Sequence, residues 1–278
     1  MNACRSWIAI GLAWALGPQA VMAQPVAIAR KHVSIERRSV PLVVVAADLR
    51  DGQTLVSLRF AHGGVPQHRC HESFADFARH AHAAAVVNGT FFSVSTYDTL
   101  GNTVIAGRLV QHRDWDTRGT ALTIARDGRA RIRTLRTEGL PDYHRAWLSF
   151  AAGPRLVKEG KVWLRPWFEG FRDPALFGRH PRTALGLTRD GRRMLLVSFP
   201  TAISLQEEAE AMRQLGVHDA LNLDGGPSVG MAYRGKLVAT PLWGITNALV
   251  LYDRQYPAPV SLQQAYRLAS EHDAGASN

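Results

Sequence analysis

An acid followed by two glycines stands at the end of an apolar run in the last third of the sequence. Residues 220–223 predict a buried strand, and Asp224, Gly225, Gly226 and Pro227 follow it. Glycine permits positive φ angles and close approach of a ligand, and proline fixes the exit of the turn. Catalytic groups are often carried on such loops of a rigid scaffold. The alternative is a tight turn without a chemical role.

Three other short motifs contain side chains that could join Asp224 in one site. They provide amide groups for hydrogen bonding and one guanidinium group, whose planar fork suits phosphate oxygens. The motifs are Asn88-Gly89-Thr90-Phe91-Phe92, His180-Pro181-Arg182-Thr183-Ala184-Leu185-Gly186 and Gly244-Ile245-Thr246-Asn247-Ala248-Leu249.

Taken in this order, the motifs resemble those of bacterial members of the phosphodiester glycosidase family. The resemblance rests on Asn-Gly-x-Phe-Phe at 88–92, Arg-Thr-Ala-x-Gly at 182–186 and Asn-Leu-Asp-Gly-Gly-x-Ser at 222–228. Residues 153–160 also resemble a family element, whereas Thr90 stands where many members have glycine. The resemblance implies an enzyme, a hydrolase that cleaves the glycosidic bond of a sugar-1-phosphodiester, with an N-acetylglucosamine-like sugar on a phosphorylated glycan.

That reaction needs a carboxylate near the anomeric carbon and a cation at the phosphate. Asp224 is the candidate carboxylate, acting as nucleophile or as base toward water, and Arg182 is the candidate phosphate clamp. His180 is a candidate donor to the leaving phosphate. The expected substrate-binding groups are polar side chains and backbone amides of Asn88, Gly89, His180, Asn222, Asn247, Gly225, Gly226 and Ser228. The backbone amides of Gly225, Gly226 and Ser228 are expected to form an anion nest.

Each assignment has a structural alternative. Arg182 could pair with a structural carboxylate, Asn88-Gly89 could form only a turn, Asn247 could cap a strand end, and His180 could lie exposed to solvent. The sequence does not single out a second carboxylate among Asp98, Asp114, Asp116 and Glu169.

The functional class also has alternatives. One is a non-catalytic protein of glycan binding or exopolysaccharide assembly that uses the same cleft. Another is a basic surface that adheres to anionic polymers, with affinity that falls as salt rises.

The formal net charge of +10 bears on possible partners. Arginines are spread along the chain without a compact basic block between aromatics, so nucleic acid is not an expected partner. The charge favours an anionic partner such as a phosphorylated glycan. His62, His68, Cys70, His71, His80 and His82 lack the paired spacing of metal ligands, so neither a metal nor another cofactor is expected.

Residues 1–23 have the features of a signal peptide. Arg5 precedes a short apolar stretch at 8–16, and Val21-Met22-Ala23 offers small residues at a cleavage site before Gln24. We therefore expect a periplasmic or secreted protein without a transmembrane segment in the mature chain. Residues 24–255 are expected to form one glycosidase-like domain, and 256–278 a C-terminal helix and frayed tail.

The elements that must position the candidate site suggest an α+β fold, with mixed, largely antiparallel sheets and a few packed helices. Dipeptides Asp51-Gly52, Asp127-Gly128, Asp190-Gly191 and Arg234-Gly235 predict hairpins. Helices are expected after Ser73 and over 204–215, where Ser204 and Glu207 can form a capping box. Each helix leads into a strand that ends near Asn88 or Asn222, and these ends would converge if the strands shared a sheet.

Overall fold

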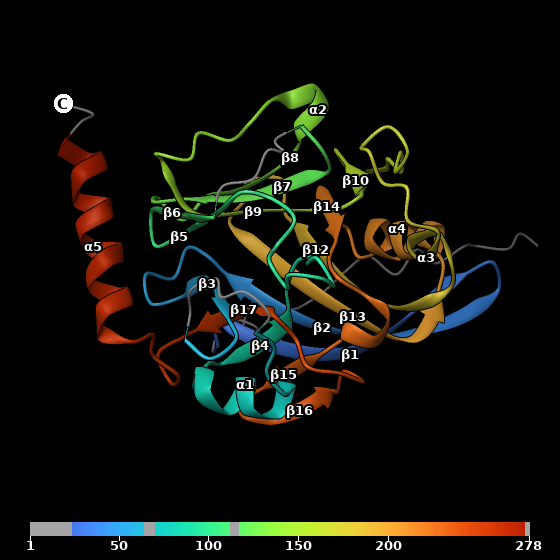
Figure 1. Cartoon of the computed structure of the whole chain (residues 1–278), viewed down its shortest axis with the longest axis horizontal. Coiled ribbons are helices and arrows are strands. Elements are labelled where there is room, and N and C mark those ends of the chain that lie inside the picture. The colour runs from blue at the N-terminus through green and yellow to red at the C-terminus, as the bar shows by residue number, and fades with distance from the viewer. Residues whose placement is uncertain (1–23, 64–69, 112–116, 276–278) are drawn as a thin grey trace, which may run out of the picture.

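The computed structural model describes residues 24–63, 70–111 and 117–275 and arranges them as three sheets with helices at the periphery (Figure 1). All strand pairs in the described ladders are antiparallel. The predicted α+β class is therefore confirmed. The expected signal peptide, residues 1–23, lies outside the described residues.

The largest sheet has seven strands and carries the loop that contains Asp224. Its order is β1 (Val26–Ile35), β2 (Arg38–Asp48), β13 (Arg193–Ile203), β12 (His180–Leu187), β14 (Asp219–Asn222), β10 (Arg155–Lys158) and β11 (Lys161–Val162). Helix α4 (Leu205–Gln214) packs on this sheet through Ala209 and Met212. The predicted capping box is formed, because Ser204 and Glu207 each bind the backbone N–H of the other.

The second sheet has five strands, and the end of its strand β4 lies beside the end of β14 in the first sheet. Its order is β16 (Lys236–Ala239), β15 (Met231–Tyr233), β4 (Ala85–Asn88), β17 (Asn247–Tyr252) and β3 (Leu55–Phe60). Helix α1 (Phe74–Ala81) covers it, with Phe74 and Phe77 packed in a cluster with Val86 and Val250. Ser73 caps α1 as predicted.

The third sheet also has five strands and lies on the other side of the molecule from α1 (Figure 1). Its order is β6 (Arg108–Gln111), β5 (Thr103–Ile105), β9 (Ala146–Ala152), β7 (Thr120–Ala125) and β8 (Ala130–Thr134). Short helices α2 (Leu135–Glu138) and α3 (Pro174–Phe177) lie in connections, and the terminal α5 (Val260–Gly275) packs Tyr266 edge-on against Trp147.

One apolar cluster joins the three sheets. Val45 of β2, Leu251 of β17 and Phe150 of β9 are all buried in it. Because the sheets share this core, their strand ends are held in fixed relation to one another. Within the described residues, no helix combines the length and hydropathy required to cross a membrane.

One prediction about strand pairing was wrong. The residues around Asp51-Gly52 do not form a hairpin, because β2 pairs with β1 and β13 while β3 pairs with β17. Val43, Val44 and Val45 are all buried, so β2 is covered on both faces and lies between two neighbours. Strands β4 and β14 belong to different sheets, although their ends do meet.

Candidate functional site

The loop that carries Asp224 lies where the end of β14 meets the end of β4. The Asp224 N–H donates to the Gly89 carbonyl at 3.1 Å, and Asn88 Nδ2 donates to the Asp224 carbonyl at 2.7 Å. Gly226–Ser228 then forms a single 3₁₀ turn. The two strand ends therefore converge, although the strands lie in two different sheets.

Asn88 is a buried hub that positions this loop. Its Oδ1 accepts hydrogen bonds from Thr183 Oγ1 at 2.8 Å and from the Gly230 N–H at 3.1 Å. Its Nδ2 holds the Asp224 carbonyl. Since both ends of the amide bind protein and the residue is 1% exposed, Asn88 fixes the backbone of Asp224, and its role in contacting substrate stays a prediction.

Asn247 and Gly89 form a second support beside Asn88. Asn247 Oδ1 accepts from the Thr90 N–H at 2.8 Å, and its Nδ2 donates to the Thr90 carbonyl at 3.1 Å. A Cβ on Gly89 would lie 2.0 Å from Asn247 Oδ1, a distance that real atoms do not tolerate. Glycine is needed at position 89 for this approach, so Gly89 and Asn247 together support the loop that carries Asp224.

Asn222 anchors β14 to the turn at Gly153. Its Nδ2 donates to the Gly153 carbonyl at 2.9 Å, and the Gly153 N–H donates to the Asn222 carbonyl at 2.9 Å. Asn222 Oδ1 is a buried oxygen without a partner among the described residues. The Asn222 side chain is 1% exposed, so it too supports the loop from beneath.

The Asp224 carboxyl group has the environment of a reactive acid. Its Oδ1 accepts from the Gly225 N–H at 2.9 Å, and the Ser228 hydroxyl also favours the charged form. Burial raises the pKa of Asp224 to about 6, against the lowering effect of these two donors. The residue keeps partial access to solvent. Near neutral pH this carboxylate is therefore mostly ionised, and its pKa lies close to the ambient pH, as a base or nucleophile requires.

The expected anion nest is largely occupied by the protein itself. The Gly225 N–H binds the Asp224 carboxylate, and the Ser228 N–H donates to the Gly225 carbonyl at 3.2 Å. Gly226 has a φ of +60°, and among these three its backbone N–H alone has no partner in the described part of the chain. Three amides aimed at a ligand were expected, and the geometry leaves one.

Arg182 fits its structural alternative. Nε donates to the Ile203 carbonyl at 3.0 Å, and Nη2 donates to the carbonyls of Leu176 and Gly178 at 2.9 and 2.7 Å. Nε also lies 3.9 Å from the buried Glu208 carboxylate. The Arg182 side chain is 3% exposed and holds α3 to the end of β13. These contacts are those of the structural alternative, and the phosphate clamp stays a prediction.

His180 is partly buried at the start of β12, with its ring against Gly178. Its ring has no hydrogen bond to another described residue, so nothing orients it toward Asp224. The side chain is partly accessible, between a buried position and the solvent-exposed alternative.

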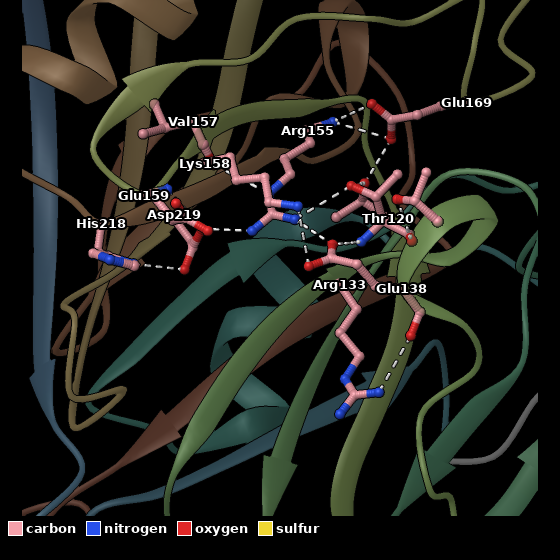
Figure 2. A network of polar contacts seen from close by, with 12 residues as sticks. Thr120, Arg133, Glu138, Arg155, Val157, Lys158, Glu159, Glu169, His218 and Asp219 are labelled. Carbon is pink, nitrogen blue, oxygen red and sulfur yellow. Dashed lines mark hydrogen bonds and ion pairs between the residues drawn. The ribbon is translucent and has the colours of Figure 1, made fainter.

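An ionic network centred on the buried Arg155 side chain joins the strands around β14 (Figure 2). Arg155 donates to Glu138 Oε2 and to Asp219 Oδ1, both at 2.5 Å. The Arg155 N–H donates to Glu169 at 2.9 Å, and Thr120 Oγ1 donates to Glu169 at 2.6 Å. Together these contacts tie β10, β14 and the third sheet to one another.

Two of the four possible second carboxylates lie within the described residues. Glu169 is 1% exposed and engaged with protein donors, and burial raises its pKa to about 7. Asp98 is 6% exposed and accepts from the Ser93 N–H through its carbonyl. Asp114 and Asp116 lie outside the described residues. Among the residues that the structure describes, no three His, Cys, Asp or Glu side chains gather as a metal site.

Sequence reasoning missed two contributors to the site. Thr183, inside a motif that was recognised, supplies a hydroxyl to Asn88. Trp243 donates from Nε1 to Ser228 Oγ at 3.0 Å and is 53% exposed. Trp243 could have been noticed in the sequence as an aromatic residue directly before Gly244, at the start of the motif that contains Asn247.

Comparison with known proteins places this geometry in a family. A model of the phosphodiester glycosidase family matches residues 81–252. The mouse N-acetylglucosamine-1-phosphodiester alpha-N-acetylglucosaminidase is 29% identical over 193 residues, which cover 64% of this chain and 37% of that protein. The cattle enzyme is 30% identical over 178 residues, covering 59% and 34%. The chain thus spans about a third of the length of these curated relatives.

Solved structures share the fold. The zebrafish N-acetylglucosamine-1-phosphodiester alpha-N-acetylglucosaminidase catalytic domain, auto-inhibited by its pro-peptide, matches with a TM-score of 0.67 at 19% identity, over 82% of this chain and 83% of that one. A hypothetical protein from Synechocystis matches with a TM-score of 0.72 at 18% identity, over 83% of this chain and 62% of that one.

Proposed function

Because this chain belongs to the phosphodiester glycosidase family, we propose that it is a hydrolase that cleaves the glycosidic bond of a sugar-1-phosphodiester. The sugar we propose is N-acetylglucosamine-like, carried on a phosphorylated glycan. The observation that supports this most directly is the Asp224 carboxyl group, partly accessible on a loop fixed at both sides, with a pKa raised to about 6 by burial.

The proposed reaction transfers the sugar from phosphate to water. The bond between the anomeric carbon and the phosphate oxygen breaks, and its electron pair leaves with the phosphate monoester. Asp224 either takes a proton from the attacking water or first bonds to the anomeric carbon, in an ester that water then hydrolyses. A phosphate monoester is a good leaving group, so strong general-acid help matters less than in an ordinary glycosidase.

Product analysis tests the proposal. We expect the protein to convert the methyl phosphodiester of N-acetylglucosamine-1-phosphate into free sugar and methyl phosphate, and Asp224→Asn to reduce kcat by at least about 10³-fold. Unchanged activity in Asp224→Asn would remove Asp224 from its role. Saturable binding of a phosphorylated glycan without turnover would instead favour the non-catalytic glycan-binding protein.

We further propose that the protein is exported and acts in the periplasm or outside the cell. The support is the n-region, apolar stretch and small-residue site within residues 1–23. N-terminal sequencing of the exported protein should begin at Gln24, and recovery of the intact chain from the cytoplasm alone would contradict export.

A further inference from the structure

Trp243 lies against the loop that carries Asp224 and leaves much of its indole uncovered. We propose that Trp243 is a sugar-binding platform that also orients the Ser228 hydroxyl toward Asp224. This inference deepens the proposed function and rests on it. It assigns the glycosyl ring, and not the phosphate, to the Trp243 side of the site.

Two contacts fix Trp243 on the 3₁₀ turn that follows Asp224. The backbone N–H of Leu242 donates to the Pro227 carbonyl at 2.8 Å, and Trp243 Nε1 donates to Ser228 Oγ at 3.0 Å. The backbone next to Trp243 and the polar edge of its indole are therefore both held, while the residue as a whole stays 53% exposed. A ring that is anchored at one edge and open elsewhere is pre-organised for a ligand.

Trp167 shows by contrast what a structural surface tryptophan looks like in this molecule. It is 57% exposed, yet its ring stacks on Phe177 with centroids 4.7 Å apart, and the Arg172 guanidinium lies 5.1 Å from its centroid. Trp243 has no ring or cation neighbour in the described ranges. An indole is a large apolar surface with a polar edge, and a pyranose ring can cover its face through its C–H groups.

The direction of the hydrogen bonds links this platform to the carboxylate. An indole N–H can only donate, so Ser228 Oγ accepts from Trp243 and keeps its own proton to donate. The Ser228 hydroxyl in turn lowers the pKa of Asp224 against the larger effect of burial. Trp243 thus contacts the 3₁₀ turn that directly follows Asp224, and a sugar with its anomeric carbon at Asp224 would lie next to the indole.

Two substitutions separate the platform from the hydrogen bond. Trp243→Phe keeps an aromatic face and removes the N–H, whereas Trp243→Ala removes both. With the methyl phosphodiester substrate, we expect Trp243→Ala to raise KM about tenfold, a loss of about 1.4 kcal/mol in sugar binding. We expect Trp243→Phe to leave KM within about threefold of the parent and to move the acidic limb of kcat/KM to higher pH. Trp167→Ala is the matched control and should leave KM unchanged.

The outcomes distinguish this inference from the proposed function. A parental KM in Trp243→Ala, with hydrolysis intact, overturns the platform and leaves the hydrolase. Equal KM increases in both variants would assign the effect to the N–H and also overturn it. Binding of methyl N-acetylglucosaminide that weakens about tenfold in Trp243→Ala but not in Trp243→Phe, measured calorimetrically in the Asp224→Asn background, supports the platform even if no turnover is found. Thermal unfolding of each variant controls for folding.

Discussion

At the scale of single residues, the behaviour of Asp224 depends on two opposing influences. Burial favours the neutral carboxyl group and raises its pKa to about 6, while the Ser228 hydroxyl and the Gly225 N–H favour the charged form. If the ionised carboxylate is the active species, kcat/KM should rise with pH through this value and level off above it. A single residue would then set the acidic limit of activity.

Ser228→Ala tests that balance. Removal of the hydroxyl takes away a donor to the carboxylate, so the pKa of Asp224 and the acidic limb of kcat/KM should move to higher pH. Activity on the alkaline plateau should fall less than activity at pH 5 to 6. A pH profile identical to that of the parent protein would show that Ser228 does not act on Asp224.

Gly89→Ala tests the close approach between β4 and Asn247. The added Cβ would lie 2.0 Å from Asn247 Oδ1, so the side chain of Asn247 or the end of β4 must move. Since the Gly89 carbonyl binds the Asp224 N–H, we expect both a loss of about 1–3 kcal/mol in unfolding free energy and a lower kcat/KM.

Gly52→Ala is the control, because its Cβ would meet nothing within 4 Å. Urea unfolding and steady-state kinetics measure both variants. Equal stability and activity in the two would contradict the requirement for glycine at position 89.

At the scale of elements, the site depends on contacts between strands that are distant in the sequence. The ionic network around Arg155 joins β10 to β14, and Glu169 joins β10 to the third sheet (Figure 2). This arrangement holds Gly153 against Asn222, at the base of the Asp224 loop. The network is therefore structural support for the site, and its charge state should affect stability.

Glu169→Gln tests the network through pH. Burial raises the pKa of Glu169 from 4.5 to about 7, so the folded protein holds this proton more tightly than the unfolded chain does. The Glu169 contribution to stability is therefore fully present below about pH 4.5 and is lost as pH rises through about 7.

Glutamine cannot titrate, so the unfolding free energy of the parent minus that of Glu169→Gln should fall between pH 5 and pH 7. Urea unfolding at pH 5, 6, 7 and 8 measures this difference. A difference that does not change with pH would show that Glu169 has no raised pKa in the folded protein.

Sequence patterns among neighbouring residues predicted helices and turns better than they predicted which strands pair. The caps at Ser73 and Ser204 and the hairpin around Asp190-Gly191 depend on neighbouring residues, and each was predicted correctly. Strand β1 was missed and β3 was assigned to the wrong partner, because pairing in a sheet depends on residues far along the chain. Asp51-Gly52 has the composition of a hairpin turn without forming one.

The same limit applied to the candidate site. The motifs around Asn88, Asn222 and Asp224 do converge, and their spacing gave no indication of which side chains would face solvent. Arg182 could not be assigned from the sequence, since its partners include carbonyls contributed by α3 and by Ile203. Trp243 was missed because its contact with Ser228 crosses the whole β15–β16 hairpin.

At the scale of the whole molecule, three sheets share one core and bring their loops together around Asp224. The net charge of +10 favours an anionic substrate by long-range attraction. Asp224 then acts at the sugar side of the phosphodiester in the reaction that we propose. The central claim is therefore about which bond breaks.

Hydrolysis in water enriched in oxygen-18 tests that claim most directly. If Asp224 directs water to the anomeric carbon, mass spectrometry of the products of the methyl phosphodiester should find the label in the free sugar and none in methyl phosphate. Label in the phosphate product, with release of sugar-1-phosphate, would show attack at phosphorus and contradict the proposed glycosidase.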